Sequence, residues 1–211
     1  MSATLELRSI DQLMAMRFVI PSYQRGYRWT RRQVVDLLDD LYGFQQQAEE
    51  MPKDAFYCLQ PVVVRPVQDG SWELIDGQQR LTSLTLLLIY LHRQLKDDQQ
   101  KGQLADLIFS MKFGKRSFNL DVAERTPCMD ALFTGKAFDD HGQSESVVNI
   151  VNRFQDIEEL FPNGLQEGAL PFFADWLIEN VHLVEITAYS DADAYTIFET
   201  MNDRGLSLTP T

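Results

Sequence analysis

Five consecutive residues hold the groups best suited to chemistry, and they lie between an expected strand and an expected helix: Asp76, Gly77, Gln78, Gln79 and Arg80. Free backbone N–H groups at a helix start favour an anion, and Gly77 allows the backbone to approach it closely. Arg80 can bind a phosphate through two hydrogen bonds, and Gln78 and Gln79 can supply neutral ones. Asp76 can bind Mg²⁺ or accept from a ribose hydroxyl. Together these groups suit a nucleotide.

The same spacing also fits an ordinary strand-to-helix turn, in which Asp76 caps the helix and Arg80 pairs with an acid. Spacing alone does not separate the two interpretations. Two adjacent glutamines stand where the helix could have carried apolar residues, and this favours a functional site.

A second candidate is the segment 20–29, where arginines and aromatic residues alternate. Such a mixture binds phosphates and stacks on bases, both in nucleotide pockets and in proteins that bind single strands. Taken alone, however, the segment fits better as a solvated basic loop whose aromatic residues cover the edge of the core. The residues of interest are Tyr23, Gln24, Arg25, Tyr27, Arg28 and Trp29.

The third candidate lies near the end of the chain, where Phe198 and Asn202 are four residues apart and share a helix face. Asn202 could reach a ligand from that face. A structural interpretation is stronger here: Phe198 packs in the core, Asn202 helps to end the helix, and Gly205 provides a left-handed cap.

Several familiar reactions are excluded. The run Gly114-Lys115-Arg116-Ser117 resembles the end of a phosphate-binding P-loop, but Phe109 stands where the upstream glycine is required. The three histidines are isolated from one another and from both cysteines, so no metal-binding spacing is present. No Gly-x-Ser-x-Gly elbow occurs, and Cys58 on an expected strand is a small buried residue more often than a nucleophile.

Composition narrows the class of protein further. The 211 residues carry a net charge of −12, which argues against wholesale wrapping of nucleic acid. Positive charge is concentrated between Gln12 and Val35, a stretch with five arginines and no acid. Two distant cysteines and the lack of a long apolar run favour a reducing, cytoplasmic location.

Hydrophobic periodicity predicts the elements that position these groups. We expect a short strand at 18–21, a helix from a cap at Thr30 to about Gly43, and a hairpin of strands 56–67 and 71–75. A helix over 81–91 is apolar on almost every face and should be buried. After a polar break at 96–103 the pattern is mainly helical to about 179, followed by a strand at 181–187 and a helix capped by Asp191 through Asp203.

The three motifs, in this order, resemble the N-terminal domain of GmrSD-type, modification-dependent restriction endonucleases. The resemblance rests on Ile20-Pro21-Ser22-Tyr23-Gln24-Arg25-Gly26-Tyr27-Arg28-Trp29, on Asp76-Gly77-Gln78-Gln79-Arg80 with its flanks, and on Phe198-Glu199-Thr200-Met201-Asn202-Asp203-Arg204-Gly205. It implies an α/β fold with a ParB/sulfiredoxin-like small mixed sheet, a buried helix after the turn, and a mainly helical middle region. The implied division is a nucleotide-binding core at 1–95, a helical region at 96–180, and a strand and helix at 181–211 that return to the core.

The resemblance also implies that the domain binds and hydrolyses a nucleoside triphosphate with Mg²⁺, and thereby regulates a His-Asn-His-type nuclease domain that attacks modified phage DNA. Asp76, Gln78, Gln79 and Arg80 match the hydrolysis motif, and Asp76 is the candidate metal ligand. The implied nucleotide contacts are Gln24, Arg25, Gly77, Arg80, Phe198 and Asn202. A second copy of the chain is a further candidate partner, and the helix-start signal Thr209-Pro210 suggests that more chain follows.

Two alternatives remain open. The arginine-rich segment could read modified DNA without nucleotide turnover, with Tyr27, Arg28, Arg31 and Arg32 as the contacts. The domain could instead be a weak ParB-like nuclease, but no acidic cluster with a lysine or histidine lies near either motif.

Overall fold

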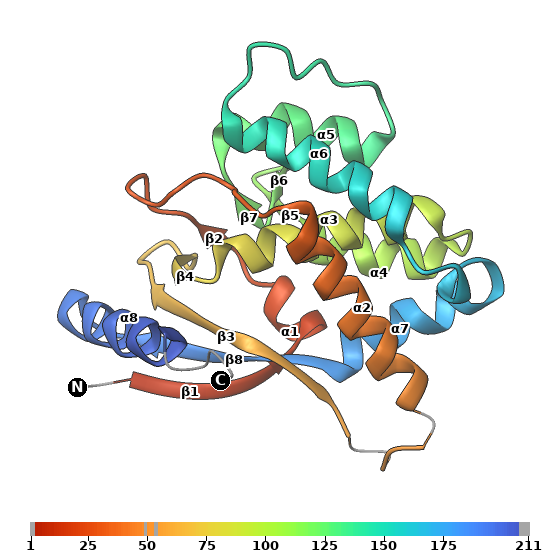
Figure 1. Ribbon diagram of the computed structural model, residues 1–211. Helices are drawn as coiled ribbons and strands as arrows, with labels where there is room; N and C mark the ends of the chain where they lie inside the picture. Colours follow the sequence, from red (N-terminus) through yellow and green to blue (C-terminus); the bar gives the residue numbers. More distant parts are fainter. Residues whose placement is uncertain (1–2, 49, 53–54, 207–211) are drawn as a thin grey trace.

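A mixed six-stranded sheet forms the centre of the protein, as a computed structural model shows for residues 3–48, 50–52 and 55–206 (Figure 1). The strand order is β1-β8-β3-β4-β2-β7. The strands are β1 (Ala3–Ser9), β2 (Phe18–Val19), β3 (Tyr57–Pro66), β4 (Trp72–Asp76), β7 (Leu120–Asp121) and β8 (Val181–Ala188). The expected α/β class is therefore confirmed.

The end of β4 is paired on one side only, since β3 pairs with it as far as Asp76 whereas β2 stops at Glu73. β3 and β4 form the antiparallel hairpin that the sequence predicts, with Gly70 at a φ of 81° in the turn. β8 runs parallel to β3 and antiparallel to β1. β2 pairs with β4 only through Phe18–Trp72 and Val19–Glu73, so β4 extends beyond its partner on that side.

Helices lie on both faces of the sheet. Three successive residues of β3 show this, because neighbouring side chains of a strand point to opposite faces. Val62 and Val64 belong to the large hydrophobic core, which includes residues of helices α1 to α7, whereas Val63 belongs to a small second cluster beneath α8. The large core contains residues from all three ranges into which the sequence was divided, namely 1–95, 96–180 and 181–211.

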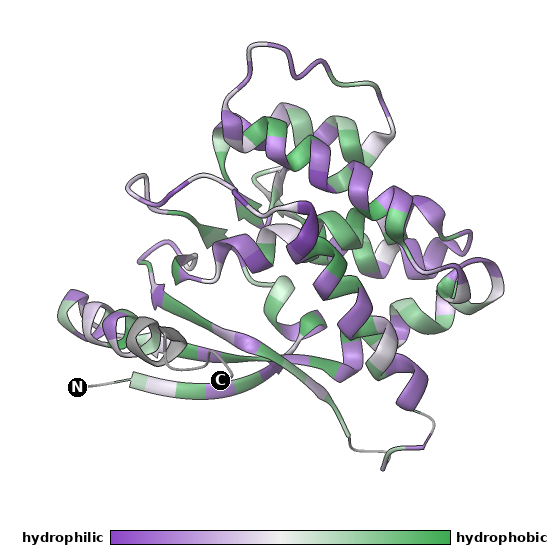
Figure 2. Cartoon of the chain, viewed as in Figure 1, coloured by the Kyte–Doolittle hydropathy of each residue, from purple (hydrophilic) through white to green (hydrophobic). Residues whose placement is uncertain are grey.

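The helices are α1 (Ile10–Met14), α2 (Arg31–Gln47), α3 (Gln78–Gln94), α4 (Asp98–Ile108), α5 (Thr126–Thr134), α6 (Glu145–Leu160), α7 (Leu170–Asn180) and α8 (Asp191–Leu206). Short 3₁₀ turns occupy Ala123–Arg125, Asn163–Leu165 and Glu167–Ala169. Hydrophobic and hydrophilic residues alternate along α2 and α6, as expected of helices with one buried face (Figure 2). In contrast, α3 is buried continuously from Leu81 to Leu91, which confirms the prediction of a buried helix.

Most expected elements are present, and the differences have physical causes. Thr30 does cap α2, but the helix continues past Gly43 to Gln47, because a glycine inside a helix costs only about 1 kcal/mol.

The polar break expected at 96–103 is wrong, since α4 begins at Asp98. Asp97 accepts a hydrogen bond from the backbone N–H of Gln100 at 2.8 Å and so starts the helix.

The sequence did not predict four strands, which are short, polar or at the edge of a sheet. β1 is an edge strand, and the small strands β5 (Phe109–Lys112), β6 (Lys115–Phe118) and β7 interrupt the mainly helical region. The run at 114–117 that resembles a P-loop forms the turn and second strand of the β5–β6 hairpin, with Gly114 at a φ of 74°. The strand expected at 181–187 is confirmed as β8.

The start of α8 is capped differently from the expectation. Ser190, not Asp191, precedes the helix, and its hydroxyl accepts a hydrogen bond from the N–H of Asp193 at 3.1 Å. Asp191 is the first helical residue and pairs with Arg65 of β3, which also pairs with Glu73 of β4. The Thr209-Pro210 signal lies outside the described residues.

No helix among the described residues is long and apolar enough to cross a membrane.

The two cysteines provide a test of the fold. The expectation of a small buried residue at position 58 is wrong, because Cys58 is exposed on β3. In contrast, Cys128 is buried in α5, and desolvation raises the pKa of its thiol to about 11. Because the thiolate is the reactive form, we expect one fast-reacting thiol per folded chain at pH 8. Labelling with a chromogenic disulfide should show that Cys58→Ser removes the fast phase. Equal rates for both thiols in the native protein would contradict this arrangement.

Candidate functional site

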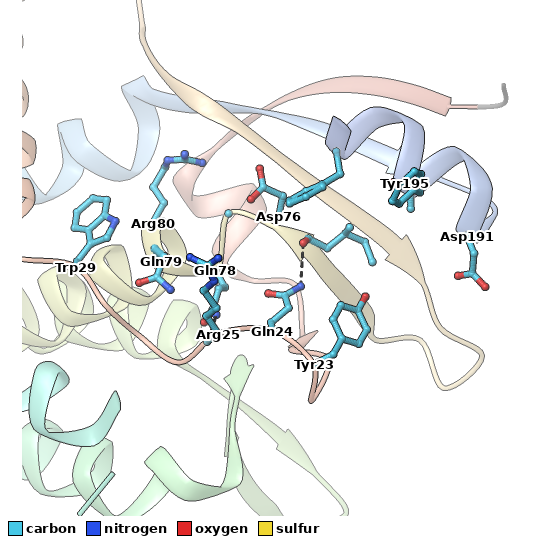
Figure 3. Close-up of a pocket in the computed structure, with 14 residues that line it drawn as sticks. Tyr23, Gln24, Arg25, Trp29, Asp76, Gln78, Gln79, Arg80, Asp191 and Tyr195 are labelled. Atoms are coloured by element: carbon cyan, nitrogen blue, oxygen red, sulfur yellow. Dashed lines mark hydrogen bonds between the residues drawn. The ribbon is translucent and has the colours of Figure 1, made fainter. Parts of the chain in front are cut away.

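The end of β4, the segment before α2 and the first turns of α8 enclose a cavity of about 970 Å³ (Figure 3). Parts of all three sequence motifs therefore lie in one place, although more than 100 residues separate the second motif from the third. The cavity is lined by Tyr23, Gln24, Arg25, Trp29, Ile75, Asp76, Gly77, Gln78, Gln79, Arg80, Asp191, Ala194, Tyr195 and Phe198.

Gly77 makes the sharp turn between β4 and α3 possible. Its φ of 102° lies in the left-handed region that side chains disfavour. A Cβ atom at this position would also stand 2.7 Å from Cγ1 of Val62. Both the backbone conformation and the close packing against β3 thus require glycine.

The first turn of α3 is left without a cap. Gly77 occupies the N-cap position, no side chain caps the helix, and the first turn contains no acid. The N–H groups of this turn and the positive end of the helix dipole are therefore available to an anion. Asp76 does not cap the helix, and its carboxylate makes no hydrogen bond or ion pair within the described chain.

Arg80 binds the backbone of β3 instead of an acid. Its guanidinium donates to the carbonyls of Gln60 at 3.1 Å and Pro61 at 2.9 Å, and to Oε1 of Gln60 at 2.7 Å. Burial lowers the pKa of Arg80, while the nearby Asp76 carboxylate acts in the opposite direction. Neither contact of the ordinary-turn interpretation is observed.

Gln78 and Gln79 attach the segment 20–29 to the helix. Nε2 of Gln78 donates to the carbonyl of Arg25, and Nε2 of Gln79 donates to the carbonyl of Gly26 at 2.9 Å. Oε1 of Gln79 accepts from the N–H of Arg28 at 2.7 Å. Both candidate catalytic amides are thus engaged by the protein itself and position the segment.

Gln24 continues this attachment on β4. Its Nε2 donates to the carbonyls of Leu74 and Ile75, the latter at 2.9 Å, beyond the last pair that β2 makes (Figure 3). The side chain thereby takes the place of a strand partner, and its Oε1 makes no hydrogen bond within the described residues.

Tyr27 anchors the same segment from the inside. It is fully buried, and its hydroxyl lies 2.7 Å from Oγ of Ser83 on α3. Ser83 itself donates to the carbonyl of Gln79, so Tyr27 is the donor. Desolvation raises the pKa of Tyr27 to about 12, which keeps the hydroxyl protonated. Tyr27 is therefore an anchor and not a surface contact for DNA in this structure.

The other candidate DNA contacts already have acidic neighbours. Arg28 lies 3.7 Å from Glu145, and Arg32 lies 2.9 Å from Asp36. Arg31 pairs with Asp156 at 2.6 Å and Glu159 at 2.9 Å.

In contrast, the exposed guanidinium of Arg25 has no hydrogen-bonding or ionic partner in the described residues and lines the cavity.

The remaining wall comes from α8. Phe198 and Tyr195, both partly exposed, face the cavity from this helix (Figure 3 labels Tyr195). The sequence did not point to Tyr195 and Asp191 as pocket residues, although Tyr195 lies three residues before Phe198 and four after Asp191, a spacing that places all three on one helix face. The expectation that Asn202 and Gly205 end the helix is wrong, because α8 continues to Leu206. The side chain of Asn202 lies outside the described part of the chain.

A metal ion in this cavity would need oxygen atoms of a bound ligand in addition to those of the protein. No group of three or more His, Cys, Asp or Glu side chains that could hold a metal occurs in the ranges described. Mg²⁺ nevertheless fits, because it commonly binds through one or two carboxylates together with phosphate oxygens and water. Asp76 is the carboxylate that could serve in this way.

These features define a mixed α/β domain whose main described cavity combines an uncapped helix start, a free carboxylate, a free cation and an aromatic rim. Comparison with protein-family models finds a match over residues 6–211 to the GmrSD restriction endonuclease, N-terminal domain. The match covers nearly the whole chain, and the protein belongs to this family. Comparison with curated proteins gives no significant match.

Family membership implies a role in a restriction system, with DNA and a nuclease domain as partners.

Two glycines allow the tight turn to be tested against a matched control. We expect Gly77→Ala to lower the free energy of unfolding by about 1–3 kcal/mol, because of the positive φ and the contact with Val62. Gly43→Ala should raise it by about 0.5–1 kcal/mol, since Gly43 lies inside α2 with open space around it. Urea unfolding measures both changes, and equal stability of the two variants would contradict the described turn.

Proposed function

We propose that this domain binds and slowly hydrolyses a nucleoside triphosphate, and that the state of its pocket regulates a nuclease domain of a restriction system directed against modified phage DNA. The observation that carries the proposal is the single cavity where an uncapped helix start, Asp76 and Arg25 lie beside aromatic side chains. Its volume is within the range of about 300–1,000 Å³ that is usual for ligand pockets.

The polar side of the cavity suits a triphosphate. The N–H groups at the start of α3 favour phosphate oxygens, and the free guanidinium of Arg25 can approach these oxygens from the adjoining segment 20–29. Asp76 would hold Mg²⁺ together with these oxygens, and the ion would supply charge neutralisation. Without an ion, the carboxylate would repel the phosphates.

The aromatic rim suits a base. Tyr23, 76% exposed, and Trp29 come from the segment before α2, while Tyr195 and Phe198 come from α8. Stacking on such side chains tolerates different bases, because every base has a π-face. The base can thus bind between two walls that come from distant parts of the chain.

Hydrolysis should be slow because no strong base is in place. Asp76 is the carboxylate available to orient water, and Gln78 and Gln79 are occupied in holding the segment. A pocket with this character acts as a switch: binding bridges the segment 20–29 and α8, and turnover separates them again. The change in α8 would be the signal to a nuclease domain.

The first test measures binding and phosphate release with each of the four ribonucleoside triphosphates and Mg²⁺. We expect Arg25→Ala to weaken binding about tenfold or more, because it removes a charge-assisted contact. Asp76→Asn should abolish Mg²⁺-dependent turnover, and Arg80→Ala should reduce it by distorting the turn. Lys115→Ala, which removes an exposed charge on the distant β6, is the matched control and should behave as the parent.

Parental binding and turnover in both Arg25→Ala and Asp76→Asn would refute the assignment of the pocket. Absence of binding by the folded parent to every triphosphate would also count against it.

The exposed pair Tyr23 and Arg25 supports a second candidate function, the reading of a modified base without nucleotide. An aromatic face and one cation can hold a single flipped nucleotide even in an acidic protein. We then expect Tyr23→Ala to abolish preference for modified over unmodified DNA oligonucleotides in anisotropy titrations. A parent that binds both DNAs equally would exclude this candidate.

A further inference from the structure

Arg125 carries a charge inside the protein that packing alone does not explain. It ends the 3₁₀ turn before α5, it is 5% exposed, and its Nε atom is buried without a hydrogen-bond partner. No carboxylate within the described residues lies at ion-pair distance from it. A buried charge without an opposite charge is costly, and a buried polar atom without a hydrogen-bond partner calls for an explanation.

The contacts of Arg125 lead directly to the pocket. One Nη donates to Oγ1 of Thr82 at 3.2 Å, and the other donates to Oε1 of Gln78 at 3.1 Å. The opposite end of the same amide donates through Nε2 to the carbonyl of Arg25. A chain of hydrogen bonds therefore connects the helical region with the segment that bears the free guanidinium of the pocket.

The chemistry of the guanidinium fixes the direction of this chain. Arginine is a donor only, so the oxygen of the Gln78 amide must face it. If the amide were rotated by half a turn, its NH₂ group would meet another donor and its oxygen would meet the carbonyl of Arg25. Only one orientation satisfies both ends, and in that orientation Gln78 holds the segment.

We propose that Arg125 is a positioning residue of the pocket, which orients the Gln78 amide and thereby holds residues 24–29 against the start of α3. Arg125 does not line the cavity, so it acts through Gln78. The inference deepens the proposed function, since it concerns the same pocket. Attachment of the segment can, however, be measured without any nucleotide.

Limited trypsin digestion of the native protein tests the attachment, because cleavage after Arg25 or Arg28 requires the segment to leave α3. Peptide mass spectrometry gives the rate at each site. We expect Arg125→Met to raise cleavage after Arg25 about tenfold, in proportion to the population of the released form. Arg116→Met, the same change at an exposed arginine paired with Asp130 at 3.4 Å, is the control and should leave that rate unchanged.

Gln78→Glu separates positioning from simple stabilisation. The new carboxylate would pair with Arg125 and compensate its charge, but it would lose the donor that binds the carbonyl of Arg25. We expect this variant to unfold at the same or a higher urea concentration than the parent and still to be cleaved faster after Arg25. Arg125→Lys, which keeps the charge and one donor direction, should give an intermediate rate.

The outcomes are distinct. Cleavage after Arg25 that stays at the parental rate in folded Arg125→Met or Arg125→Lys would overturn the inference, as would cleavage that merely follows global stability across the variants. If Arg125→Met releases the segment and also weakens triphosphate binding about tenfold, both proposals stand. If the segment is released but the parent binds no triphosphate, the positioning role stands and the proposed function fails.

Discussion

The attachment of residues 20–29 to the start of α3 is the constraint on which the rest of the site depends. β2 is two residues long, so the chain that follows it has no ladder to hold its backbone groups. Side-chain amides replace the ladder: Gln24 binds β4, while Gln78 and Gln79 bind the segment in return. This reciprocal arrangement forms one wall of the pocket and places Arg25 and Asp76 in the lining of the same cavity.

The burial of α3 in the core keeps this attachment in a fixed position. A helix that is apolar on nearly every side is fixed in position by the core, so its uncapped first turn is held in place as well. Tyr27 and Ser83 join the segment to this helix within the core itself. The anion-favouring end of the helix is therefore held in place by the core, so the proposed binding of a nucleotide would require little ordering of this turn.

The sequence predicted the elements that have strong periodicity and the motifs that surround the pocket, because hydrophobic spacing and the turn at Gly77 are local signals. Contacts that depend on distant partners could not be predicted. The functional interpretation of Gln78 and Gln79 took their amides to be free, whereas the carbonyls that occupy them belong to residues about 50 positions earlier. Arg125 gave no signal at all, since its importance arises only where α5 approaches α3. Edge strand β1 and the two-residue β7 are too short or too exposed for their pattern to stand out.

The unequal attachment of the two pocket walls sets the order in which the domain loosens. Among the side chains that the structure describes, the segment 20–29 contacts a core of more than 40 buried residues, whereas α8 shares a cluster of four buried residues with β3 and β8 and pairs with Arg65 of β3 through Asp191 (Figure 1). The free energy of separating an element scales with the apolar area that it buries, so α8 detaches at a lower cost than global unfolding. The two walls of the pocket therefore differ in stability, and we expect a displacement of α8 to change the spacing between Tyr195 and Tyr23 before it disturbs the segment 20–29.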